Sequence, residues 1–254
     1  MPNDVRWIVS AVKNASILED KMHFVNRDTA IAQLQDVHRS NYNRQKFHGG
    51  CNWRIPLCDN LFGMGKSEFA RQYINRCRSA AFMPNSLVNF KESLCRAHTV
   101  TICFSKGELA DPAVFEERSL VMLQSTLIPF FEVAPRCLYK HYPRTRSFLA
   151  ELTQEAGPVF IAVDEIGRAF DGDNKDDVAQ QELFLKFCES VLQSWLELPN
   201  VYFLVLGQAS ILNYVGARRD VFSPQSASPY DFVRLAITSD GNYDCHRFGW
   251  NLNF

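Results

Sequence analysis

The chain has 254 residues, and 46% of them are apolar, which is enough to fill the core of one large domain. With 27 basic and 28 acidic side chains the formal net charge is −1, so charge does not indicate nucleic acid or an anionic membrane as a partner. The eight cysteines and six histidines are dispersed without close pairs, which argues against a disulfide framework or a zinc site. We expect reduced, mostly buried thiols and an intracellular compartment, cytoplasmic or nuclear.

No targeting or membrane segment is evident in the sequence. Residues 1–10 lack the basic stretch followed by an apolar core that a secretory signal peptide requires. The uncharged run at residues 198–217 is interrupted by proline, asparagine, glutamine and serine. It therefore predicts no membrane span.

From about residue 54 onward, short apolar runs alternate with longer amphipathic stretches, which is typical of a parallel sheet wrapped by helices. Strands are predicted at residues 54–58, 98–104, 159–163, 201–206 and 232–237. Helices are predicted at residues 66–78, 112–131 and 176–196, with a short one near 210–215. Polar segments at residues 41–50, 136–146 and 223–228 are predicted to be loops. The fold class is therefore α/β.

The segment at residues 60–67 reads NLFGMGKS and lies between a predicted strand and a predicted helix. A turn of small residues here aims backbone N–H groups and the positive end of the helix dipole at one place, which suits polyphosphate. The segment matches the phosphate-binding loop G-x-x-x-x-G-K-[ST] except at its first residue, where asparagine replaces glycine. Among the other residue types, asparagine is the one that best tolerates a left-handed backbone. We expect Lys66 to reach the β- and γ-phosphates and Ser67 to ligate Mg²⁺. The nucleotide-binding residues are then Asn60, Gly63, Met64, Gly65, Lys66 and Ser67.

The predicted strand at residues 159–163 is followed by two carboxylates, Asp164 and Glu165. This fits the second nucleotide-site motif, Walker B, because phosphate-bound Mg²⁺ needs an anionic ligand at the carboxyl end of a buried strand. We expect Asp164 to be a metal ligand and Glu165 to orient or deprotonate the attacking water. Taken alone, the two carboxylates also fit the cap of a following turn or helix. The alternative for the loop at residues 60–67 is a plain glycine-containing helix start with an exposed lysine.

Two further catalytic candidates follow the predicted strand at residues 201–206. Gln208 lies at the tip of that strand, where it could sense the γ-phosphate, although a polar residue is expected at the end of any parallel strand. Arg218 and Arg219, in the loop beyond, could supply a cation to the γ-phosphoryl group in cis or to a neighbouring subunit. Arg168 is a rival for that cation, and a merely solvated pair is the alternative.

Upstream, residues 24–28 read FVNRD and precede a helix-like stretch at residues 29–38. This box resembles the F-V-G-R-E box of STAND-type and related AAA-like ATPases, in which it packs beside the adenine. The resemblance carries Val25 and Arg27 over as contacts to the base. The alternative is a surface turn with a helix cap at Asp28.

Together, the box, the loop that ends at Ser67, the carboxylates and the strand tip at Gln208 resemble the P-loop NTPase domain of Crinkler effectors and retrotransposon-hot-spot proteins. The resemblance spans about residues 22–238. It implies a three-layer fold with a central parallel five-stranded sheet in the order 5-1-4-3-2 and helices on both faces. It divides the chain into a lead segment at residues 1–45, an NTPase core at 46–240 and a C-terminal tail at 241–254. It also implies delivery to a host cell.

The motifs lead us to expect a Mg²⁺-dependent ATP-binding NTPase that hydrolyses ATP slowly and serves as a switch or effector module. The absence of an N-K-x-D motif favours ATP over GTP. Residues 240–254 are too few for the helical lid of AAA-like ATPases, so we expect a truncated product, a divergent core-only form, or one half of a site that a protein partner or a second copy completes. One alternative is a catalytically degenerate nucleotide-binding scaffold, which Asn60 and the missing lid favour. Another is a small-molecule kinase of the P-loop class.

Overall fold

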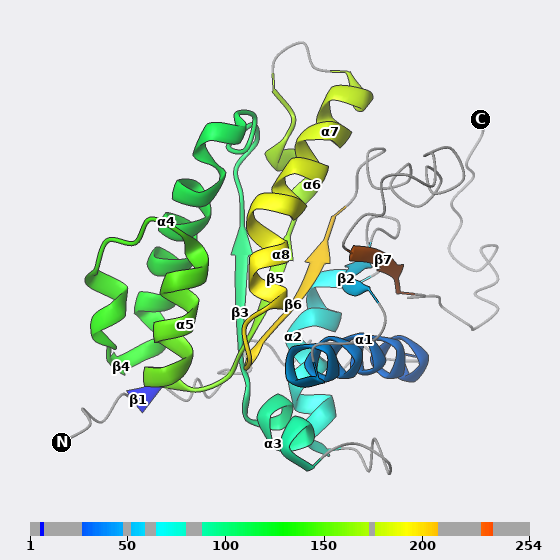
Figure 1. Cartoon of the computed structure of the whole chain (residues 1–254), viewed down its shortest axis with the longest axis vertical. Coiled ribbons are helices and arrows are strands. Elements are labelled where there is room, and N and C mark those ends of the chain that lie inside the picture. Colours follow the sequence, from blue (N-terminus) through cyan, green and yellow to red (C-terminus); the bar gives the residue numbers. More distant parts are fainter. Residues whose placement is uncertain are drawn as a thin grey trace, which may run out of the picture.

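The computed structural model describes residues 6–7, 27–47, 52–58, 65–79, 88–172, 176–207 and 230–235. Within them, five strands form a central parallel sheet in the order β3-β5-β6-β2-β7 (Figure 1). These strands are β2 (Trp53–Cys58), β3 (His98–Cys103), β5 (Val159–Asp164), β6 (Val201–Leu206) and β7 (Tyr230–Arg234). Numbered among themselves along the chain and read from β7, they stand in the order 5-1-4-3-2. The structure thus confirms the α/β fold class.

A second sheet of two short strands was not predicted. β1 (Arg6–Trp7) pairs antiparallel with β4 (Phe131–Val133). The indole of Trp7 donates a hydrogen bond to the carbonyl of Ala156 at 2.7 Å and stacks on the ring of His98, with 4.0 Å between ring centroids. Strands this short carry no periodicity from which a sequence could reveal them.

Helices cover both faces of the central sheet (Figure 1). One face carries α1 (Asp28–Phe47), α2 (Lys66–Ser79) and α3 (Val88–Arg96). The other carries α4 (Phe115–Leu127), α5 (Thr145–Ala156), α7 (Asp177–Phe187), the π-helical segment η5 (Cys188–Leu192) and α8 (Gln193–Leu196). Short turns of helix link them, namely η2 (Pro112–Val114), η3 (Ile128–Phe130), η4 (Arg136–Tyr139) and α6 (Ile166–Ala169). The molecule therefore has three layers.

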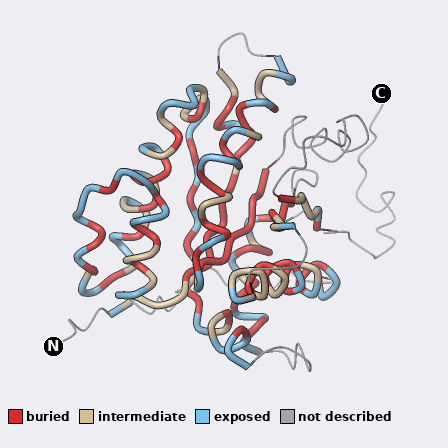
Figure 2. Tube along the Cα trace, in the orientation of Figure 1, coloured by how far each residue is buried: buried red, intermediate tan, exposed pale blue. Residues whose placement is uncertain are grey.

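The core lies on both sides of β5 and β6, which are buried at every position (Figure 2). Coverage on both faces explains why these strands read as continuous apolar runs. Because side chains of a strand alternate, Ile161 and Val163 join the core under α4, α5 and α7, whereas Phe160 and Ala162 join the core under α1 and α2. Each large apolar side chain buried in this way contributes about 1.5–3 kcal/mol.

The loop predicted at residues 41–50 is wrong over most of its length, because α1 continues to Phe47. Asn41 and Gln45 belong to this part of α1. The side-chain amide of Asn41 bonds to the backbone of Arg54 on β2, and that of Gln45 donates to the carbonyls of Leu196 and Leu198. The predicted boundary between residues 45 and 46 also falls inside α1. This helix packs its side chains into the same core cluster as α2.

Two other predictions need correction. The helix predicted at residues 112–131 is shorter, since α4 ends at Leu127 and a 3₁₀ turn that contains Pro129 leads into β4. Residues 136–146, predicted as a loop, contain η4 and the first residues of α5, and neither α3 nor α5 was predicted. The helix predicted at 176–196 is present as α7, η5 and α8 in direct succession.

Some predictions concern segments for which the structure gives no description, namely the short helix near residues 210–215 and the loop at 223–228. Among the residues that are described, no helix combines the length and the apolar character needed to cross a membrane. Four of the six cysteines in this part of the chain are buried, as predicted for most of the thiols, and all six are free.

Candidate functional site

The segment that follows β2 brings the first candidate residues to the carboxyl edge of the sheet. Gly65 has φ +72°, in the left-handed region that glycine adopts at little steric cost. α2 begins at Lys66, and the N–H of Phe69 closes its first turn on the carbonyl of Gly65 at 2.8 Å. The first backbone N–H groups of a helix have no acceptor within the helix, so this end of α2 is suited to bind phosphate oxygens.

The end of β5 lies beside this start of α2. The hydroxyl of Ser67 donates a hydrogen bond to Oδ2 of Asp164 at 2.6 Å. β5 lies between β3 and β6, and Asp164 itself is only 8% exposed. Two residues that are far apart in the sequence, and that the motifs predict as Mg²⁺ ligands, are therefore in direct contact.

Glu165 directly follows the strand in an unusual backbone conformation. Its φ is +53° and its ψ is 29°, which costs a residue with a Cβ about 1–3 kcal/mol. Its N–H donates to Oδ1 of Asp164 at 2.9 Å, and its carbonyl accepts from the N–H of Arg168 at 3.0 Å as α6 begins. Both oxygens of Asp164 thus accept hydrogen bonds, and the turn that carries Glu165 is held by bonds on both sides.

The tip of β6 lies beside the end of β2. The N–H of Gly207 donates to the carbonyl of Cys58 at 3.1 Å. Gln208 comes immediately after this contact in the chain but lies outside the described residues. Arg218 and Arg219 also lie outside the described residues.

One residue of the upstream box lies next to the loop glycine. Nη2 of Arg27 is 3.7 Å from the place where a Cβ on Gly65 would stand, so the guanidinium approaches the loop closely. Burial lowers the pKa of this guanidinium from its ordinary value. The remaining loop and box candidates are not among the described residues; they are Val25, Asn60, Gly63 and Met64.

Sequence reasoning missed Cys103, which lies opposite Asp164 in the pairing of β3 with β5. Burial, followed by the negative charges of Asp164 and Glu165, raises the pKa of its thiol. The available signal was its position at the end of a predicted strand, because parallel strands end at one edge of a sheet.

The loop after β3 was also missed as a neighbour of the site. The N–H of Gly107 donates to the carbonyl of Arg168 at 3.1 Å, and the N–H of Leu109 donates to the carbonyl of Ala169 at 2.8 Å. These bonds fasten the loop to α6. The turn that carries Glu165 is therefore supported by a segment that is distant in sequence and carries no recognisable motif.

The donors at this edge suit Mg²⁺ better than a transition metal. Mg²⁺ prefers oxygen ligands, keeps several waters and binds through one or two protein groups together with substrate phosphates. Ser67 and Asp164 offer a hydroxyl and a carboxylate within 2.6 Å of each other. In the described part of the chain, no three histidine, cysteine, aspartate or glutamate side chains gather as metal ligands.

Comparisons with known proteins give a likeness of fold only. No family model matches the chain, and no curated protein matches it. Among solved structures, a Walker-type ATPase of Pyrococcus abyssi has a TM-score of 0.43 at 18% identity, covering 82% of this chain and 53% of its own. The ORC2 protein of Aeropyrum pernix, in ADPNP and ADP complexes, has a TM-score of 0.39 at 15% identity, with 84% and 48% covered.

This chain thus spans about half the length of each of these two structures. Likenesses at such scores do not bear on chemistry, which rests on the contacts described above. The resemblance to Crinkler effectors stays a prediction from the motifs.

Proposed function

We propose that the chain binds Mg²⁺-ATP at the carboxyl edge of its sheet and hydrolyses it slowly, as a P-loop NTPase that serves as a switch for a partner. The observation that carries the proposal is the hydrogen bond from Ser67 to Asp164 at 2.6 Å. It joins a helix start that suits phosphate to a buried carboxylate that suits a divalent cation. A lone glycine-lysine helix start would not require a carboxylate at this place.

Each residue of the site has one task in this proposal. The N–H groups at the start of α2 and the ammonium of Lys66 hold the β- and γ-phosphates. Ser67 and Asp164 hold the cation, which neutralises charge on the phosphates once bound. Glu165 accepts a proton from the water that attacks the γ-phosphorus, and the bond from that phosphorus to the bridging oxygen of ADP breaks.

Other residues complete the proposal from the sequence. Gln208 at the β6 tip senses the γ-phosphate, and Arg218 or Arg219 supplies a cation, in cis or to a second copy. Val25 and Arg27 contact the base, and the closeness of Arg27 to Gly65 supports this part. Asn60, Gly63 and Met64 complete the phosphate-binding loop.

Lys66→Ala tests the binding step. Titration of a fluorescent ATP analogue should show affinity about 10–100-fold weaker than that of the wild type, since a hydrogen bond to a charged group contributes roughly 1.5–3 kcal/mol. Lys91→Ala, on the exposed surface of α3, is the matched control and should bind as the wild type does. Equal binding by the Lys66 variant and the wild type would contradict the proposed site.

Glu165→Gln tests turnover separately. Phosphate release should fall by about 100-fold or more while ATP affinity stays within about threefold, because general-base catalysis contributes roughly 10²–10⁴-fold. Binding by the wild type without phosphate release, and no effect of Glu165→Gln, would instead identify a nucleotide-binding scaffold.

A further inference from the structure

The seam between β2 and β6 is open over most of its length. These strands pair only at Leu57 with Val205 and at Cys58 with Leu206, although β6 pairs with β5 from Val201 to Val205. Cys58 uses its carbonyl toward the β6 side, where Gly207 donates to it. Backbone groups alternate in direction along a strand, so Pro56 and Arg54 also face β6. Proline has no N–H to donate, and the ladder stops there.

A stripe of polar side chains on α1 fills this open seam. The stripe consists of His38, Asn41 and Gln45, whose three- and four-residue steps place them on one face of the helix. Asn41 accepts from the N–H of Arg54 at 2.9 Å and donates to its carbonyl at 2.8 Å, in the manner of a neighbouring strand. Gln45 donates to the carbonyls of Leu196 and Leu198 at 2.7 and 3.0 Å.

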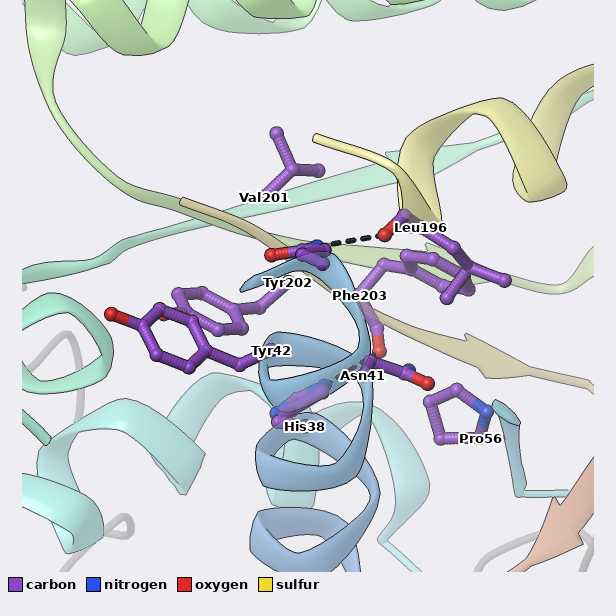
Figure 3. A pocket seen from close by; sticks show the side chains of 9 residues that line it. His38, Asn41, Tyr42, Pro56, Leu196, Val201, Tyr202 and Phe203 are labelled. Carbon is purple, nitrogen blue, oxygen red and sulfur yellow. Dashed lines mark hydrogen bonds between the residues drawn. The ribbon is translucent and has the colours of Figure 1, made fainter. Parts of the chain in front are cut away.

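Figure 3 shows the stripe from close by, with His38 and Asn41 of α1 beside Phe203 of β6 and Pro56 of β2. The cavity between them measures about 10 Å³, which is room for about one water molecule. A ligand therefore does not fit here. Side chains of α1 thus fill the space between β2 and β6, and a shift of β6 would require α1 to move as well.

His38 joins three elements through two hydrogen bonds. Its Nε2 lies 3.0 Å from the carbonyl of Phe203 on β6, and its Nδ1 lies 3.0 Å from the hydroxyl of Tyr73 on α2. A carbonyl only accepts, so Nε2 carries the proton and Nδ1 accepts from Tyr73 when the ring is neutral. Burial lowers the pKa of His38 to about 4, so the ring is neutral at physiological pH. The donors and acceptors of the ring are then fully matched.

We propose that His38 is a positioning residue of the nucleotide site, which fixes α2, with Lys66 and Ser67 at its start, relative to β6, whose tip leads to Gln208. This inference rests on the proposed function. α2 and β6 meet the γ-phosphate from two sides in that proposal, yet β6 is not bonded to β2 along most of their common seam. His38 connects α2 to β6 through its hydrogen bonds to Tyr73 and Phe203, where the β2–β6 pairing is absent.

The link matters most for the γ-phosphate. In the proposed site the phosphate-binding loop and the start of α2 hold the β-phosphate, whereas the γ-phosphate also requires the tip of β6 in register with α2. Loss of the link should therefore reduce the preference for ATP over ADP more than it reduces binding of ADP. A side chain that merely stabilised the fold would leave that preference unchanged.

The test is the ratio of ATP affinity to ADP affinity, each measured by titration with Mg²⁺ present. In His38→Ala and in Tyr73→Phe the ratio should fall by about fivefold or more, the lower end of ordinary coupling between sites. In the double variant the ratio should be no lower than in His38→Ala, because both changes break the same link. His38→Gln, which keeps one donor and one acceptor, should recover most of the ratio.

Gln45→Ala is the matched control, since it removes hydrogen bonds between α1 and the segment before β6 without touching α2. It should lower the unfolding temperature and leave the ratio as in the wild type. If His38→Ala does not fold, Tyr73→Phe carries the test, because it removes only a hydroxyl.

An unchanged ratio in the His38 and Tyr73 variants, or an equal fall in Gln45→Ala, overturns the inference while the proposed function stands. A wild type that binds neither nucleotide overturns both.

Discussion

The two seams on either side of β6 are built differently. Toward β5, a ladder pairs Val159–Val163 with Val201–Val205 residue by residue. Toward β2, only two pairs exist, and side chains of α1 occupy the rest of the seam. The phosphate-binding residues follow β2, while the carboxylates end β5, so the candidate site spans both seams.

The two seams are therefore held together by different groups: backbone hydrogen bonds at the β5–β6 seam, and side chains at most of the β2–β6 seam. A ladder of backbone hydrogen bonds forms with almost any apolar sequence, and single substitutions change its stability but hardly its geometry. A seam bridged by a few polar side chains depends on each of them, because a buried group that loses its partner keeps its desolvation cost. We therefore expect substitutions at the closed seam to act on stability alone, and substitutions of His38 at the open seam to act on the site as well.

The largest expected effect is on stability, at the closed seam. Ile161→Ala on β5 should lower the free energy of unfolding by about 2–5 kcal/mol, because the side chain is buried in the core under α4, α5 and α7. The ratio of ATP to ADP affinity should not change. Urea unfolding and nucleotide titration of the same preparation measure both, and a changed ratio would remove the contrast between the seams.

A smaller loss is expected from Asn41 at the open seam. Asn41→Ala leaves the N–H and the carbonyl of Arg54 without their side-chain partner, which should cost about 1–3 kcal/mol of unfolding free energy. Asn41→Asp should lose at least as much, because it sets a buried carboxylate oxygen against the carbonyl of Arg54 in place of the amide N–H. Urea unfolding of the two variants checks the order, and equal stability of Asn41→Ala and the wild type would mean that water replaces the amide.

Acid should weaken the open seam through His38. The pKa of His38, about 4 in the folded state, lies below the ordinary 6.5, so the unfolded chain takes up more protons below pH 6.5. The contribution is fully present above that pH, and about 2 kcal/mol of it should be lost by pH 5. Burial lowers the pKa of His98 to about 4 as well, which adds a loss of the same sign.

Urea unfolding at pH 7, 6 and 5 tests this prediction. The free energy of unfolding of His38→Gln should depend less on pH than that of the wild type. The remaining decrease toward low pH is the one expected from His98. A variant with the same slope as the wild type would show that His38 is not held neutral in the fold.

The strands could be predicted because their signals are local, whereas their order was an implication of the resemblance to P-loop NTPases. Runs such as residues 159–163 are apolar throughout, and motifs at Lys66 and Asp164 mark the strand ends that meet. The contact between Ser67 and Asp164 follows from the same rule, since parallel strands present their carboxyl ends at one edge. That contact required no knowledge of distant packing.

The open seam could not be predicted because the sequence of this part of α1 indicates a loop. Asn41 and Gln45 are polar and followed by glycines at residues 49 and 50, which is typical of a loop. Only the tertiary structure turns these amides inward, where Asn41 bonds to the unpaired part of β2 and Gln45 to the segment before β6. The left-handed backbone of Glu165 is likewise set by its partners, Asp164 and α6, and not by its own preference.

The most direct test of the central claim is the effect of Mg²⁺ on ATP affinity in the wild type and in Ser67→Ala, with Ser125→Ala on the exposed face of α4 as the matched serine control. Mg²⁺ should strengthen ATP binding to the wild type and to the control by about tenfold or more, and to Ser67→Ala by about threefold or less. Equal strengthening in all three proteins would contradict a cation site formed by Ser67 and Asp164.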